Sequence, residues 1–127
     1  MPTSRNQRLQ ILVVDDEAAI RSVIKMFLQY EGHEVQTVSS GEEALSLLEN
    51  SKFDLIITDY SMLDMKGDEL AAIIKQRLPA QPIIMISAYA EMLKGSGNPL
   101  TGVDALVSKP FLLKDLREAI ARVLPAS

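Results

Sequence analysis

Apolar and polar positions alternate along the chain in blocks that predict short buried strands separated by helices. Four apolar runs of strand length occur at 11–14, 55–58, 83–86 and 105–107, and a stretch of alternating character at 33–38 is a fifth candidate strand. Longer segments, most of them with apolar residues at helical spacing, separate these runs. Alternating strands and helices are typical of a parallel sheet with crossover helices, so we expect an α/β domain.

The segments between the strands carry helix start and stop signals. In the first segment, Gly32 stands where a helix would stop, after apolar residues that we expect on one buried face. These apolar residues are Ile20, Val23, Ile24, Phe27 and Leu28. Ser40 and Glu43 have the spacing of a capping box, which predicts the start of a second helix that ends near Asn50.

Two further helices are predicted, with a short or irregular one between them. Asp68 and Glu69 place negative charge at the positive end of one helix. Its apolar residues are Leu70, Ile73, Ile74 and Leu78. The segment 113–124 is amphipathic. The residues expected to point inward are Leu116, Ile120 and Val123. The stretch 90–93 has helical character, but the glycines and proline of 95–99 make a long regular fourth helix unfavourable.

Length and composition narrow the possible functions. The 127 residues suit one ordinary domain, and we expect a single domain over residues 1–127 with its core at about 9–124. The net charge of −4, without a basic cluster, argues against a nucleic-acid-binding surface. The lack of cysteine and the single histidine exclude thiolate metal sites and sites with several imidazoles. Because no uncharged apolar stretch could span a bilayer, we expect a soluble, cytoplasmic protein.

Polar side chains stand at the ends of four of the candidate strands. They are Asp15 and Asp16, Asp59, Ser87 and Lys109. In an open parallel sheet the ligand site lies beyond the carboxyl ends of the strands, where the strand order reverses, so we expect these residues to converge. Carboxylates, a hydroxyl and an ammonium on one edge suit a divalent cation and a phosphoryl group.

These residue types suggest separate roles in such a site. An ionised carboxylate can take a phosphoryl group in line, and Asp59 is the candidate nucleophile because it stands alone on its loop. Magnesium is the natural counter-ion for clustered acids, with Asp15 and Asp16 as its holders. Lys109 and Ser87 would contact oxygens of the transferred group. Taken singly, these residues also fit helix capping, an Asx-turn or a surface lysine, so the argument rests on their conjunction.

The motifs also occur together in one order along nearly the whole chain. They are Val14-Asp15-Asp16-Glu17, Asp59 followed by Met62 and Gly67, Ser87-Ala88, and Lys109-Pro110-Phe111. This combination resembles the response-regulator receiver domain of two-component signalling. The resemblance implies a flavodoxin-like fold, with one doubly wound five-stranded parallel sheet of order 2-1-3-4-5.

The resemblance also implies a phosphorelay function. Asp59 would accept a phosphoryl group from a histidine kinase or phosphotransfer protein, while Ser87 and Lys109 read the bound phosphate. The implied Mg²⁺ ligands are Asp15, Asp16, Asp59 and the backbone carbonyl of Ser61. The signal would pass by conformational change to an unknown downstream protein or fused output domain, without direct contact to nucleic acid or membrane. The protein would catalyse only its own phosphorylation and dephosphorylation. Glu17 is expected to be helix-terminal rather than a metal ligand.

Three departures from the family pattern leave other functions open. Leu63 stands where the family usually has proline, Leu106 where it commonly has tyrosine or phenylalanine, and 95–99 where its fourth helix contributes to the output face. Leu106 and the glycine-rich stretch favour a receiver-like interaction module that acts independently of phosphorylation, whereas the intact acids, serine and lysine oppose it. A haloacid-dehalogenase-like phosphatase would need an acid two residues after its nucleophile, where this chain has Ser61.

Overall fold

The computed structural model describes residues 8–62, 65–88 and 102–124. The segment in which we expected a short or irregular fourth helix lies outside these ranges, as does Leu63. None of the helices in the described ranges is both long and apolar enough to cross a membrane.

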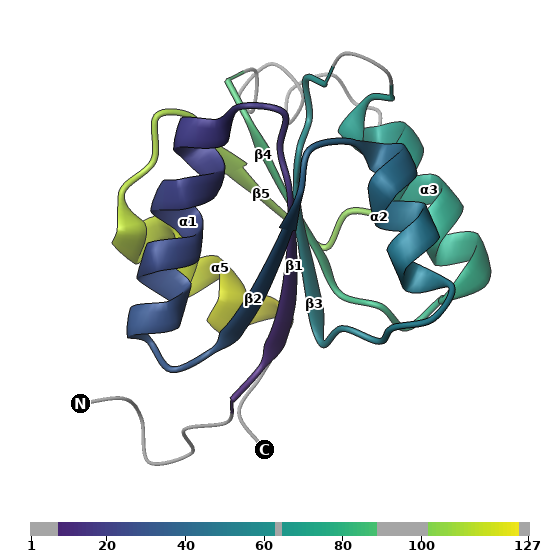
Figure 1. Cartoon of the computed structure of the whole chain (residues 1–127). Coiled ribbons are helices and arrows are strands. Elements are labelled where there is room, and N and C mark those ends of the chain that lie inside the picture. The colour runs from purple at the N-terminus through teal and green to yellow at the C-terminus, as the bar shows by residue number, and fades with distance from the viewer. Residues whose placement is uncertain (1–7, 63–64, 89–101, 125–127) are drawn as a thin grey trace.

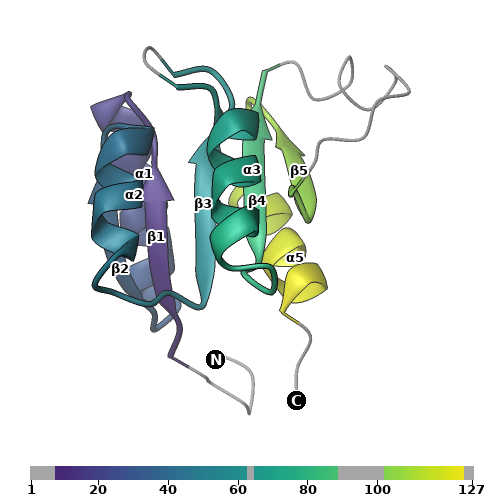
Figure 2. The ribbon, with the colours of Figure 1, turned by 90° about the vertical axis from the view of Figure 1, so that its right-hand side faces the viewer.

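Five parallel strands form one sheet in the order β2-β1-β3-β4-β5, which confirms the predicted topology (Figure 1). The strands are β1 (Gln10–Val14), β2 (Glu34–Val38), β3 (Leu55–Asp59), β4 (Ile83–Ser87) and β5 (Ala105–Ser108). The helices are α1 (Ala18–Tyr30), α2 (Gly41–Leu48), α3 (Gly67–Arg77) and α5 (Leu113–Val123). Helices α1 and α5 cover one face of the sheet, and α2 and α3 cover the other, as Figure 2 shows from the side.

The two helical layers create two apolar cores, one on each face of the sheet. In β1, Ile11 and Val13 belong to the core beneath α1 and α5, and Leu12 and Val14 belong to the core beneath α2 and α3. Strands buried on both faces read as continuous apolar runs, which is why the sequence pattern located them. The chain adds strands first on one side of β1 and then on the other, so strand order reverses between β1 and β3.

The buried face of α1 is narrower than the apolar pattern indicated. Ile24, Phe27 and Leu28 are buried as expected, but Val23 is 49% exposed. At about 100° per residue, Val23 lies on the side of the helix occupied by Met26, which is 69% exposed. The prediction that Val23 points inward was therefore wrong, because an apolar residue at the margin of a helical stripe need not reach the sheet.

The predicted helix ends are largely confirmed. Gly32 follows α1 with a φ of +96°, a conformation that favours glycine over residues with a Cβ. The Oγ of Ser40 accepts a hydrogen bond from the Glu43 N–H (3.1 Å) at the start of α2, as the capping box predicted. The Glu43 carboxylate accepts hydrogen bonds from the N–H (2.8 Å) and the Oγ (2.9 Å) of Ser39, and a weaker one from the N–H of Ser40. The cap therefore extends one residue further toward the strand than the capping box alone.

Gly67 allows α3 to begin directly against the end of β3. Its N–H donates to the carbonyl of Tyr60 (2.8 Å). A Cβ at this position would overlap the carbonyl oxygen of Asp59 and lie 3.0 Å from the Cα of Tyr60. Both neighbours are backbone atoms, which cannot move aside as the end of a flexible side chain could. The sequence therefore needs glycine here for space.

Replacing Gly67 by alanine should destabilise the protein by about 1–3 kcal/mol through overpacking. Urea unfolding followed by circular dichroism measures this loss. Gly32→Ala is the matched control, because nothing lies within 4 Å of its new Cβ and only the positive φ is strained. Both variants should lose stability, but only Gly67→Ala should shift the amide NMR signals of Asp59 and Tyr60. Unchanged signals at these two residues would contradict the proposed overlap.

Candidate functional site

The acids predicted to converge do so at the carboxyl edge of the sheet. Val14 of β1 pairs with Thr58 of β3, which places Asp15 beside Asp59 where strand order reverses. Asp15 and Asp59 are buried, and Asp16 is partly exposed. Each of the three residues offers a carboxylate oxygen within 4.8 Å of the other two. The convergence expected from the strand-end pattern is therefore found for all three acids.

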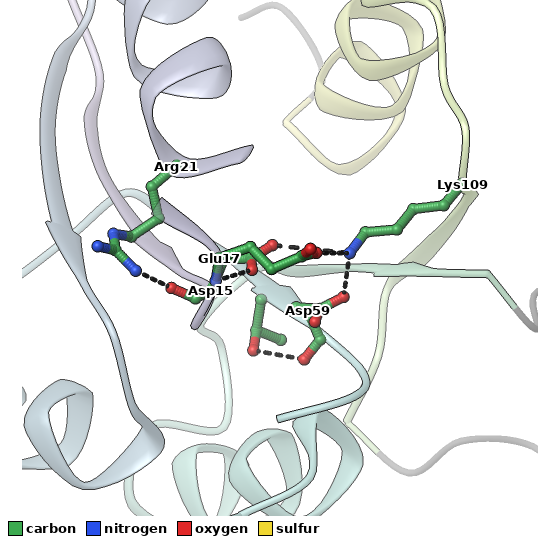
Figure 3. Close-up of polar contacts among 6 residues, drawn as sticks. Asp15, Glu17, Arg21, Asp59 and Lys109 are labelled. Atoms are coloured by element: carbon green, nitrogen blue, oxygen red, sulfur yellow. Dashed lines mark hydrogen bonds and ion pairs between the residues drawn. The ribbon is translucent and has the colours of Figure 1, made fainter. Parts of the chain in front are cut away.

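Lys109 brings a cation to this cluster from the end of the edge strand β5 (Figure 3). Its Nζ lies 2.9 Å from Asp59 Oδ1 and 3.8 Å from Asp15 Oδ2. Only 19% of its side chain is exposed, so it is not a solvated surface lysine. The lysine follows β5, and its peptide bond to Pro110 is cis.

Ser87 lies at the same edge, between the acids and the lysine in the order of the strands. It is the buried last residue of β4, which pairs with β3 on one side and β5 on the other. Its carbonyl accepts a hydrogen bond from the N–H of Lys109 (2.9 Å). Ser61 is exposed two residues beyond Asp59. The roles of the Ser87 hydroxyl and of the Ser61 carbonyl remain predictions.

Burial makes Asp15 and Asp59 harder to ionise. Burial raises the pKa of Asp15 to about 6, against the hydrogen bond from the Glu17 N–H, and the neighbouring charge of Asp59 adds to the rise. Burial also raises the pKa of Asp59, although the hydrogen bond and the charge of Lys109 oppose this. The folded protein thus holds negative charge where water solvates it poorly.

A raised pKa has the opposite meaning for Lys109, because it favours the charged form of the lysine. Burial by itself lowers the pKa of Lys109, but the hydrogen bond that Lys109 donates to Asp59 and the charges of Asp59 and Asp15 outweigh burial and raise the pKa above its ordinary value. The side chain is therefore a fixed cation at neutral pH. It serves as the counter-charge that the buried acids require.

Two contacts of this site escaped the sequence reasoning. Glu17, expected only as a helix-terminal residue, is the N-cap of α1, but its Oε1 also lies 3.4 Å from Lys109 Nζ. Arg21, in the next turn, donates from Nη1 to the backbone carbonyl of Asp15 (2.5 Å). The only sequence feature that could have indicated these contacts is that Glu17 and Arg21 follow Asp15 and Asp16 closely along the chain. Nothing in the spacing pairs Glu17 with a lysine 92 residues later.

The donor set fits a hard divalent cation. Among the described residues, Asp15, Asp16 and Asp59 form the group able to hold a metal ion, and each offers carboxylate oxygen. Oxygen ligands without nitrogen or sulfur favour Mg²⁺ or Ca²⁺ over zinc and other transition metals. Burial, together with the neighbouring charge of Asp59, disfavours the ionised form of Asp15, and a bound cation would favour that form again.

Comparison with known proteins agrees with this geometry. Residues 11–121 match the family model of the response regulator receiver domain. The chain is 37% identical over 119 residues to a probable transcriptional regulator, ycf27, of Porphyra purpurea, covering 94% of this chain and 49% of that protein. It is 33% identical over 118 residues to the alkaline phosphatase synthesis transcriptional regulatory protein PhoP of Bacillus subtilis, covering 93% and 49%. The chain thus spans about half the length of these curated relatives.

Solved structures show the same likeness. The response regulator TrrA of Thermotoga maritima, crystallised in complex with Mg²⁺-BeF, has a TM-score of 0.83 and 36% identity, covering 93% of this chain and 100% of that one. The chemotaxis response regulator CheY4 of Vibrio cholerae has a TM-score of 0.84 and 31% identity, with the same coverage. With the family model, the fold and the acidic cluster in agreement, the chain belongs to the receiver domains of two-component response regulators.

Proposed function

We propose that Asp59 accepts a phosphoryl group from a histidine kinase or phosphotransfer protein in a magnesium-dependent reaction. The observation that carries this proposal is the 2.9 Å contact between Asp59 and Lys109 beside two further acids. A nucleophilic carboxylate, a metal-binding group and a fixed cation are the parts that phosphoryl transfer requires. All three occur at the point of the sheet where ligands bind in folds of this class.

The reaction follows from the chemistry of these groups. A carboxylate oxygen of Asp59 forms a bond to phosphorus while the P–N bond of the donor phosphohistidine breaks. The imidazole nitrogen leaves with the electron pair, and Asp59 becomes an acyl phosphate. Lys109 then pairs with a phosphoryl oxygen in place of the carboxylate that it now contacts, and the Ser87 hydroxyl binds a second oxygen.

Asp15, Asp16, Asp59 and the backbone carbonyl of Ser61 would hold Mg²⁺. The bound ion would neutralise charge on the phosphoryl oxygens and between the acids. The Mg²⁺-BeF complex of the similar TrrA protein supports this assignment. The magnesium assignment is compatible with the Lys109 contact, because the ammonium lies 2.9 Å from Oδ1 of Asp59 and a carboxylate has a second oxygen to offer.

The phosphorylated state would differ from the present one mainly around Lys109. Its ammonium would have to leave the Asp59 carboxylate, and the end of β5, which Lys109 follows, would move with it. Leu106 is a half-buried residue of β5, so an aromatic ring cannot relay the signal from this position. We propose that the target is a downstream protein or a fused output domain, which agrees with the greater length of the transcriptional regulators that the chain resembles.

Leu106 also favours a second candidate function, an interaction module that works without phosphate. Asp59→Asn separates the two candidates. The variant should lose the response to kinase stimulation in a signalling assay in cells, because an amide cannot form the acyl phosphate. A variant that signals like the parent under stimulation would instead support the phosphate-independent module.

Incubation with acetyl phosphate and Mg²⁺ should add one phosphoryl group to the protein, located on Asp59 by mass spectrometry after acid quenching. Chelation of Mg²⁺ and the Asp59→Asn variant should each abolish the added mass. Asp68→Asn is the matched control, since it removes the same charge from the first turn of α3 and should leave the reaction intact. Phosphorylation that persists in the chelator or at another residue would refute the proposed site.

Without divalent cations, the free energy of unfolding should fall as the pH rises from about 4 to about 6. Asp15 holds its proton more tightly in the folded protein than in the unfolded chain, so stability is greatest when it is protonated and is lost as it ionises. The contribution is of the order of 1–3 kcal/mol. Asp15→Asn should flatten this pH dependence, measured by urea unfolding in chelator.

Mg²⁺ provides the complementary arm of this experiment. At pH 7.5 it should restore stability to the parent by binding the ionised acids, and it should do so less for Asp15→Asn. An Asp15→Asn variant with the same pH dependence as the parent would show that another group is responsible.

A further inference from the structure

Glu17 directs its side chain to Lys109 instead of capping its own helix. Its backbone is extended (φ −94°, ψ 114°), and its N–H donates to Asp15 Oδ1 (2.8 Å). Its side chain makes no capping hydrogen bond to α1, a helix that the structure describes in full. Instead, Oε1 lies 3.4 Å from Lys109 Nζ, as Figure 3 shows. The backbone of Glu17 is therefore held by Asp15, and its carboxylate is directed to the lysine.

Exposure distinguishes Glu17 from the other acids around Lys109. Its side chain is 63% exposed, whereas those of Asp15 and Asp59 are 2% and 4% exposed. Asp15 and Asp59 therefore contact the ammonium from the interior, and Glu17 contacts it from the solvent side. A phosphoryl group that reaches Lys109 from the side on which Glu17 is exposed comes close to the Glu17 carboxylate.

The Glu17–Lys109 contact is poorly suited to a purely structural role. An ion pair with a partner this exposed contributes little to stability, because water and salt screen it. The same negative charge nevertheless acts on any anion that enters the site. Its repulsion grows with the charge of the entering anion, since the Coulomb energy is proportional to the product of the two charges.

We propose that Glu17 selects among phosphodonors by charge, disfavouring doubly negative acyl phosphates relative to phosphoramidate, whose net charge is smaller near neutral pH. This inference rests on the proposed phosphoacceptor function of Asp59. In both reactions an Asp59 oxygen bonds to phosphorus. With acetyl phosphate the P–O bond breaks and acetate leaves with the electron pair. With phosphoramidate the P–N bond breaks and the nitrogen leaves with the pair as ammonia.

Glu17→Gln tests the proposal, because it removes the charge and keeps the backbone N–H that donates to Asp15. Initial rates of Asp59 phosphorylation are measured by rapid acid quench and mass spectrometry, with each donor in excess and Mg²⁺ present. For a phosphoryl group about 6 Å from the carboxylate in water, the rate should rise roughly tenfold with acetyl phosphate and roughly threefold with phosphoramidate. Both gains should shrink at high ionic strength.

The controls separate charge selection from other effects. Glu49→Gln removes the same charge at the C-terminal end of α2, which is the end away from the site, and it should leave both rates unchanged. Glu17→Asp keeps the charge and should retain most of the discrimination between donors. A Glu17→Gln variant with an unaltered ratio of the two rates would overturn the proposal, whether or not both rates change. Absence of phosphoryl transfer to the parent from either donor would overturn the proposed function itself, and this inference with it.

Discussion

Buried negative charge at the carboxyl edge of the sheet is the constraint on which the site depends. Three carboxylates can gather there because β1 and β3 are neighbours whose ends coincide in register. Such a cluster is costly in a poorly solvated environment, and Lys109 offsets part of the cost through its contact with Asp59. The raised pKa of Asp15 shows that the compensation is incomplete. The site is thus already biased toward binding further positive charge.

The surrounding backbone holds the acids in this unfavourable arrangement. Arg21 binds the carbonyl of Asp15, and the N–H of Tyr60 donates to the carbonyl of Ile86, which ties the chain after Asp59 to β4. Gly67 then lets α3 start against the same segment. A well-packed framework can keep like charges together because the two apolar cores contribute far more free energy than the repulsion removes. The functional site thus lowers the stability of the fold, and packing elsewhere compensates for this.

Most of the fold and the main site residues could be predicted from the sequence, because each doubly buried strand is an apolar run that ends in a polar residue. Asp15, Asp59 and Lys109 were found by that rule. The rule could not detect the contact of Glu17 with Lys109, since a pairing across 92 residues depends on how two loops meet rather than on periodicity. The exposure of Val23 was missed for a related reason, because hydropathy does not reveal how wide a helical stripe the sheet can cover.

The order in which the chain supplies the members of the site has a consequence for biosynthesis. The acids come from the first half of the receiver domain, whereas Lys109 follows β5 near its end. A chain emerging from the ribosome therefore exposes the negatively charged half of the centre before its neutralising partner exists. The site is complete only when β5 and α5 have docked, so the protein becomes competent late in its synthesis. Premature termination upstream of β5 would leave a protein with a nucleophile but without its cation.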